Sequence, residues 1–144
     1  MSQTADAVKK PRPGAKMRLI DATGYRLPAA GWVSILHRVS GLVMFILLPF
    51  IIWMFDTSLT SEITYSQFTS VFTGGTGFLP GWFYKLIALA LIWSYLHHLI
   101  AGLRHLWMDA THAVSLQFGR SSALVTLVVS IVLTLALGAK LFFF

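Results

Sequence analysis

Cysteine is absent from the 144 residues of this sequence. Its absence excludes disulfide bonds, zinc sites and iron–sulfur clusters held by thiolates, and covalent attachment of a c-type haem to this chain. Any metal or cofactor chemistry here must therefore use nitrogen, oxygen or thioether ligands.

Charged residues are also scarce. They make up 11% of the chain, against roughly a quarter in a typical soluble domain. Hydrophobic residues make up 56%, and the mean hydropathy is +0.74. Six of the eleven Lys and Arg residues lie within the first 26 positions, so no basic face on a folded domain is left to bind nucleic acid. A short basic tail before long apolar runs indicates the cytoplasmic flank of a membrane protein.

Three apolar stretches are long enough to cross a bilayer, which takes ~20 helical residues. They cover residues 29–55, 81–108 and 122–144. We therefore predict an all-α membrane protein with a basic tail, residues 1–28, followed by one three-helix transmembrane domain, residues 29–144. Tryptophans stand near the ends of the first two stretches, where interfacial aromatic residues belong.

The connections predict the orientation. The first, residues 56–80, is rich in Ser and Thr, carries a predicted surface helix over 62–72, and has only acidic charges. The second connection, 109–121, is brief and contains Arg120. Positive charge favours the cytoplasmic side, which places the N-terminus inside and the C-terminus outside.

The third span carries small or hydroxylated residues at every fourth position. Such a stripe lets helices approach closely in lipid, and we prefer this packing role to a cofactor-lining one. The stripe consists of Ser122, Thr126, Ser130, Thr134 and Gly138.

Ionisable residues inside the first two spans are the candidate functional residues, because burying them in hydrocarbon costs several kcal/mol. The second span places four residues on one helical face that extends about 16 Å toward the cytoplasmic surface. The first span carries a similar stripe that opens to the same side. The two sets are His98, Gly102, His105 and Asp109, and Ser34, His37, Arg38 and Gly41.

His98 is a candidate axial ligand for haem, since neutral imidazole coordinates iron without adding charge to the membrane. Gly102, one turn away, leaves room for a flat macrocycle, and Arg104, His105 and His37 are candidates to pair with propionates. A hydrogen bond between helices is the alternative role for a membrane histidine. His97 competes with His98 but points about 100° away from the candidate face.

A second axial histidine is expected from another subunit. Neither of the other two spans offers a histidine at the depth of His98, and His37 lies about 6 Å nearer the cytoplasmic face.

Ser34 and Arg38 suit a quinone head group near the membrane edge. A hydroxyl donates to a quinone carbonyl, and a guanidinium stabilises the charge that builds there during reduction. Asp109 is a candidate to deliver protons from the cytoplasm. Interfacial snorkelling is the alternative role for Arg38.

Two motifs resemble those of a known family. The segment from Ser34 to Gly41, SILHRVSG, resembles the SxxHRxSG signature of the cytochrome b subunit of succinate dehydrogenase. The segment from His98 to Asp109, HLIAGLRHLWMD, resembles that family's second signature, HxxxGxRHxxxD.

The resemblance implies that His98 ligates haem b, that Ser34 and Arg38 line the ubiquinone site, and that Asp109 lies close to it. It also implies a second small membrane subunit that supplies the other haem ligand, an iron–sulfur subunit and a flavoprotein. The Tyr25–Pro28 segment is similar to bacterial members, which favours the bacterial cytoplasmic membrane over the mitochondrial inner membrane.

The resulting hypothesis is a haem b anchor that passes electrons from succinate to ubiquinone in the respiratory chain and the tricarboxylic acid cycle. The chain itself is not expected to bind succinate or to be active alone. Two alternatives stay open: a self-contained b-type cytochrome that uses His37 and His98 as a pair, and a haem-free structural anchor.

Overall fold

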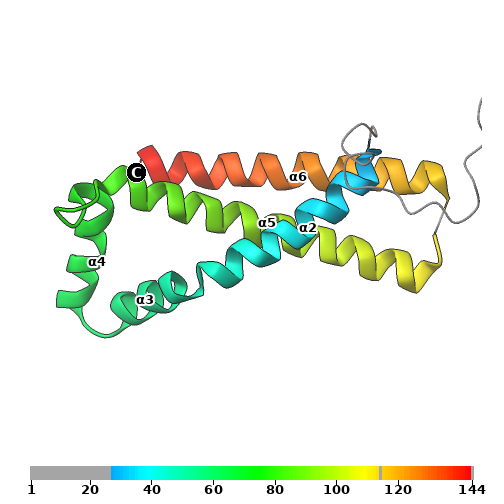
Figure 1. Ribbon diagram of the computed structural model, residues 1–144. Helices are drawn as coiled ribbons and strands as arrows, with labels where there is room; N and C mark the ends of the chain where they lie inside the picture. The colour runs from blue at the N-terminus through cyan, green and yellow to red at the C-terminus, as the bar shows by residue number, and fades with distance from the viewer. Residues whose placement is uncertain (1–26, 114, 144) are drawn as a thin grey trace, which may run out of the picture.

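The computed structural model describes residues 27–113 and 115–143, and this part of the chain is helical throughout apart from its connections (Figure 1). Three helices are long and apolar enough to cross a membrane, as predicted. The basic tail up to residue 26 lies outside the described residues. The helices are α2 (Ala29–Ile46), α3 (Leu48–Leu59), α4 (Glu62–Gly74), α5 (Gly81–Thr111) and α6 (Leu116–Phe143).

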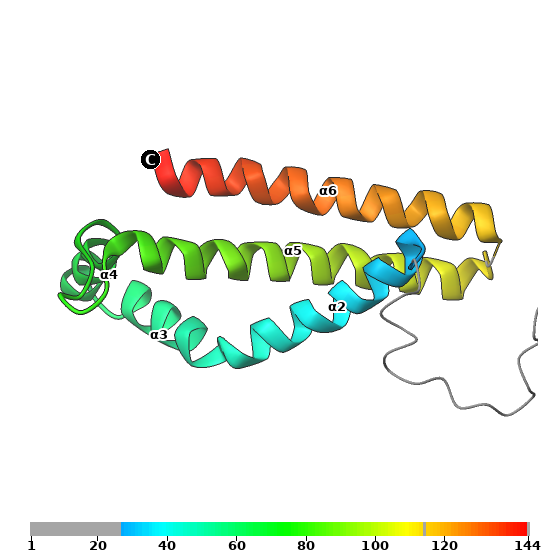
Figure 2. The ribbon, with the colours of Figure 1, turned by 45° about the horizontal axis from the view of Figure 1, so that its top comes forward.

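The first apolar stretch is divided into two helices, where the sequence predicted a single span over 29–55. The break falls at Leu47, whose N–H still donates to the Val43 carbonyl at 3.0 Å. Pro49 stands in the first turn of α3. Proline has no N–H to continue the ladder of α2, but it is tolerated in the first turn of a new helix. Of the two helices, α2 alone is long and apolar enough to cross a membrane, and α3 continues the chain at an angle to it (Figure 2).

Helix α6, which contains the third predicted span, begins at Leu116, six residues before that span. Ser115 favours this start, because its hydroxyl accepts from the Phe118 N–H at 3.3 Å in the manner of an N-cap. At the other end of the same connection, α5 extends to Thr111 and stops at His112, which adopts a left-handed conformation (φ 53°). The connection predicted over 109–121 is thus only a few residues long.

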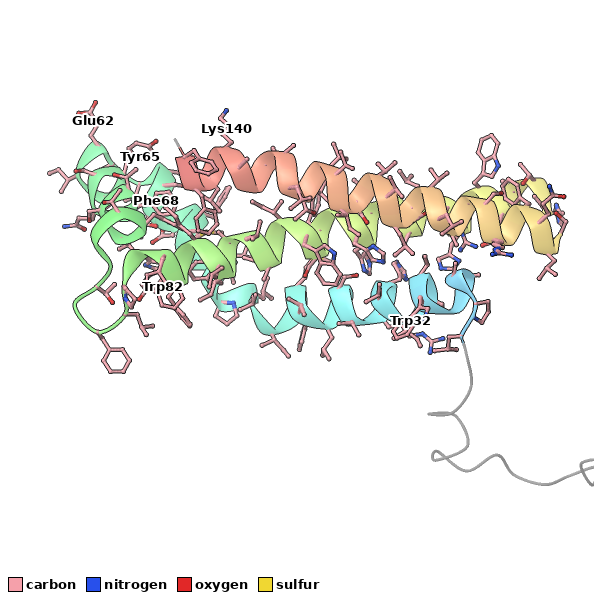
Figure 3. The ribbon with its side chains drawn as sticks, turned by 90° about the horizontal axis from the view of Figure 1, so that it is seen from above. Trp32, Glu62, Tyr65, Phe68, Trp82 and Lys140 are labelled. Atoms are coloured by element: carbon pink, nitrogen blue, oxygen red, sulfur yellow. The ribbon has the colours of Figure 1, made fainter. Side chains whose placement is uncertain are left out.

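The predicted surface helix in the first connection is confirmed as α4. Ser61 caps it: its hydroxyl accepts from the Thr64 N–H at 3.2 Å, while the Thr64 hydroxyl accepts from the Ser61 N–H at 3.0 Å. Helix α4 packs against α3 and α5, at the end of the molecule that carries Trp82 and Lys140 (Figure 3). Trp32 lies toward the opposite end, so Trp32 and Trp82 stand at the two ends of the bundle.

Helix α5 lies between α2 and α6 and packs against both (Figures 1 and 2). Thr126, Ser130, Thr134 and Gly138 of the α6 stripe are buried here, and Ser122 is half-buried. A Cβ added at Gly138 would come within 2.7 Å of Leu89 Cδ1. The stripe therefore serves close helix packing. The fully buried apolar residues where the three helices meet are few and small: Val33, Ala101 and Ala123.

Candidate functional site

The crossing of α2 and α5 brings three histidines together. The His37 ring on α2 stacks on the His98 ring on α5, with centroids 4.1 Å apart and planes inclined by 19°. His105, two turns further along α5, lies 5.4 Å from His37. The two stripes predicted from the sequence thus meet where α2 crosses α5 (Figure 1).

The His98 ring is held at one nitrogen by α2. Its Nδ1 lies 3.0 Å from the main-chain oxygen of His37 and 3.2 Å from the hydroxyl oxygen of Ser40. Ser40 is fully buried, and its hydroxyl donates to the same His37 carbonyl at 2.8 Å. These contacts occupy Nδ1 and leave Nε2 as the nitrogen of His98 that is able to bind a metal.

Two glycines shape this cluster. A Cβ at Gly41 would lie 3.1 Å from Cε1 and 3.4 Å from Nδ1 of His98, so any side chain there would press on the ring. Gly102 was expected to make room for a macrocycle. In the structure a Cβ at Gly102 would meet Nε2 of His37 at 3.7 Å, an ordinary contact distance. Gly41 is therefore the glycine in close contact with His98.

His97 lies on a different side of α5 from its neighbour His98. It is fully buried, its Nδ1 is 3.2 Å from the Ser130 hydroxyl on α6, and its ring stacks on Trp93. These contacts match the interhelical hydrogen bond that was the alternative role for a membrane histidine. The helical geometry that separates the two rings by about 100° is what directs His97 to α6 and His98 to α2.

Arg104 is not brought to the histidine cluster. Its guanidinium points to α6, where Nε donates to the Ser122 hydroxyl at 2.9 Å and Nη2 donates to the Gly119 carbonyl at 3.1 Å. It stands seven residues after His97 and so shares that residue's face of α5. Of the candidates for propionate binding, His37 stacks on His98 in this structure, and His105 lies beside His37.

The candidate quinone residues of α2 stand next to His37 in the sequence and on its helix. Ser34 is half-buried and Arg38 is exposed, one helical turn apart on α2 and beside His37. Asp109 is exposed near the end of α5, on the face that carries His98 and His105. A hydroxyl, a guanidinium and a carboxylate thus accompany the histidines at the end of the bundle where α2 begins and α5 ends (Figure 1).

The donor set fits one axial position of a haem better than a bare metal ion. No group of three or more His, Cys, Asp or Glu residues with metal-site geometry occurs in the described ranges, 27–113 and 115–143. His98 offers a single imidazole whose Nδ1 is held by the His37 carbonyl while Nε2 is left for a metal. This arrangement is common among metal-binding histidines. The His37 ring lies face to face with the His98 ring, so in this structure the two imidazoles are stacked and not opposed.

Ser40 is the residue of this site that the sequence interpretation missed. It belongs to the SILHRVSG segment, but its hydroxyl is not ionisable, and the candidate residues were chosen among the ionisable ones and their neighbours. Its position three residues after His37, on the side of α2 that also buries Val33, was the available signal.

Comparisons with known proteins agree with the two motifs. The family model described as succinate dehydrogenase/fumarate reductase transmembrane subunit matches residues 16–137. Three bacterial proteins named succinate dehydrogenase cytochrome b556 subunit are similar along most of their length. The one from Coxiella burnetii is 30% identical over 83% of this chain and 90% of its own. Those from Paracoccus denitrificans and Rickettsia felis are 28% and 26% identical, over 76% and 95% of this chain and 78% and 98% of their own.

Proposed function

The chain belongs to the succinate dehydrogenase/fumarate reductase transmembrane subunit family, and we propose that it ligates haem b through His98 and receives ubiquinone at Ser34 and Arg38. Membrane anchoring of this oxidoreductase complex is the role of the family and of this chain. The single observation that carries the proposal is the His98 ring, held at Nδ1 by α2 with its other nitrogen left for iron.

The remaining redox centres belong to partners. With no cysteine, this chain cannot hold an iron–sulfur cluster, so a separate iron–sulfur subunit must bring electrons from the flavoprotein that oxidises succinate. The second axial ligand comes from another small membrane subunit, because His37 stacks on His98 instead of facing it across a shared metal position. The open side of α2 and α5 beside Ser34 and Arg38 is where these partners and the quinone meet.

Haem b, when bound, supplies reversible one-electron chemistry at its iron. His98 Nε2 is the ligand from this chain, and Gly41 allows its ring to lie close against α2. His37 stacks on that ring and His105 lies beside His37, and both are side chains of this cluster able to donate to anionic propionates. We assign Arg104 to α5–α6 packing because its guanidinium donates two hydrogen bonds to α6.

Quinone reduction needs two electrons and two protons at the quinone oxygens. The Ser34 hydroxyl donates a hydrogen bond to one carbonyl oxygen, and the Arg38 guanidinium stabilises negative charge that develops there. Both residues lie on α2, one helical turn apart. Asp109 is exposed at the same end of the bundle, where it is able to take protons from water and pass them inward.

This end of the bundle is the cytoplasmic one in our proposal, within a bacterial cytoplasmic membrane. The support is the positive-inside rule applied to the segments that flank the helices. Six Lys and Arg precede α2 in the sequence and Arg120 follows the α5–α6 connection, whereas the 56–80 connection carries only Asp56 and Glu62. A soluble iron–sulfur subunit that docks on the cytoplasmic face would then deliver electrons close to Ser34 and Arg38.

A matched pair of histidine variants tests the haem assignment. In the assembled complex, His98→Ala should remove or shift the reduced-minus-oxidised haem spectrum, whereas His97→Ala should change it far less. Succinate oxidation with an artificial dye verifies that the soluble subunits are attached. Loss of the spectrum in His97→Ala together with a normal spectrum in His98→Ala would show that the wrong histidine was chosen.

The same spectrum separates the alternatives. A haem band from this chain expressed alone would favour the self-contained cytochrome, which the stacked arrangement of His37 and His98 argues against. No band from the assembled complex would favour the haem-free anchor.

A further inference from the structure

The contacts around Ser40 form a closed triangle. The His98 Nδ1 lies 3.0 Å from the His37 carbonyl oxygen and 3.2 Å from the Ser40 hydroxyl oxygen, and the two oxygens are 2.8 Å apart. A carbonyl oxygen carries no hydrogen, so the 3.0 Å contact requires the proton to be on Nδ1. The single hydroxyl proton of Ser40 is directed to the same carbonyl, and a lone pair of its oxygen therefore faces Nδ1.

The other tautomer does not satisfy this triangle. If the proton were on Nε2, the lone pair of Nδ1 would face the His37 carbonyl oxygen at 3.0 Å without a hydrogen between them. Ser40 is fully buried in the described part of the protein, so bulk water does not replace its hydroxyl as the partner of Nδ1. The arrangement selects the imidazole with its lone pair on Nε2.

We propose that Ser40 is a positioning residue of the haem site: together with the His37 main-chain carbonyl it fixes the tautomer and orientation of His98 and thereby tunes how strongly His98 binds iron. This inference rests on the proposed ligation by His98. Hydrogen-bond acceptors on the far nitrogen of a ligating histidine orient the ring and raise its basicity. His98 belongs to α5, but the orientation of its ring is fixed by residues of α2.

The chain contains a close match to Ser40 that serves as a control. Ser130 is also fully buried, its hydroxyl donates to the main-chain oxygen three residues earlier (Leu127, 3.0 Å), and it lies 3.2 Å from Nδ1 of a histidine. That histidine is His97, on the α6 side of α5. Removal of either serine hydroxyl therefore deletes the same kind of contact, but only Ser40 acts on His98.

The experiment compares Ser40→Ala with Ser130→Ala in the purified, fully assembled complex. We expect Ser40→Ala to shift the low-spin electron paramagnetic resonance g-values and the midpoint potential of the haem. We also expect it to release haem about 10- to 100-fold faster, the usual effect of losing such a supporting contact. Ser130→Ala should keep the parental g-values, potential and release rate.

A second pair isolates the hydroxyl if Ser40→Ala fails to assemble. Ser40→Thr and Ser40→Val have nearly the same shape, but only threonine retains the hydroxyl, so Thr should preserve the haem signals relative to Val. Identical signals in both members of each pair would overturn the role of Ser40. If His98→Ala abolishes the haem spectrum at the same time, the ligand assignment survives. If His98→Ala keeps a normal spectrum, the ligand assignment itself has failed.

Discussion

Replacing Gly41 by alanine should loosen the haem by pressing on its ligand. The added Cβ would lie 3.1 Å from Cε1 of His98, whereas ordinary contacts of this kind are 3.4 Å or longer. The ring must therefore move by a few tenths of an ångström. It cannot move freely, because the His37 carbonyl holds its Nδ1 at 3.0 Å. Overpacking of this kind typically costs about 1–3 kcal/mol.

That cost corresponds to a haem affinity weaker by about 5- to 150-fold, most of it expressed as faster dissociation. The assay is the rate of haem transfer from the purified complex to excess apomyoglobin, alongside the g-values of the haem that remains. Gly119→Ala is the control, because a Cβ at Gly119 meets nothing within 4 Å. A Gly41→Ala complex that releases haem at the parental rate with parental g-values would refute the steric argument.

Two further outcomes are expected. Arg104→Gln should lower the thermal stability of the complex and leave the haem spectrum in place, because the guanidinium donates hydrogen bonds to Ser122 and Gly119 on α6. Loss of haem without loss of stability would show that Arg104 acts at the haem site instead. For topology, a cysteine introduced at Ser66 on α4 should react with a membrane-impermeant reagent in intact cells and a cysteine at Ser2 should not; the reverse pattern would invert the proposed orientation.

The overall fold could be predicted because lipid imposes a simple rule. Three long apolar stretches must become three helices, since every main-chain polar group in hydrocarbon needs an internal partner. Helix ends were harder to predict, because they depend on single residues: Pro49 interrupts the first stretch and Ser115 starts α6 early. Hydropathy averages over such residues and does not detect them.

The helical period predicted which residues share a face but not what lies opposite that face. It placed His98 and His105 together and separated His97 from them, and both features are present in the structure. It could not show that Arg104 turns to α6, or that Gly41 and not Gly102 touches His98. Those facts depend on how α2, α5 and α6 cross, which a single sequence does not encode in its periodicity.

The central claim, that this crossing joins the haem ligand to the quinone site, is tested most directly by comparing two activities of one complex. Succinate-driven ubiquinone reduction and succinate-driven dye reduction are measured with Ser34→Ala and Arg38→Leu. The account predicts that ubiquinone reduction falls on the order of 10²- to 10³-fold in each variant while dye reduction persists, since each change removes an interaction with the developing charge. Near-parental ubiquinone reduction in both assembled variants would contradict it.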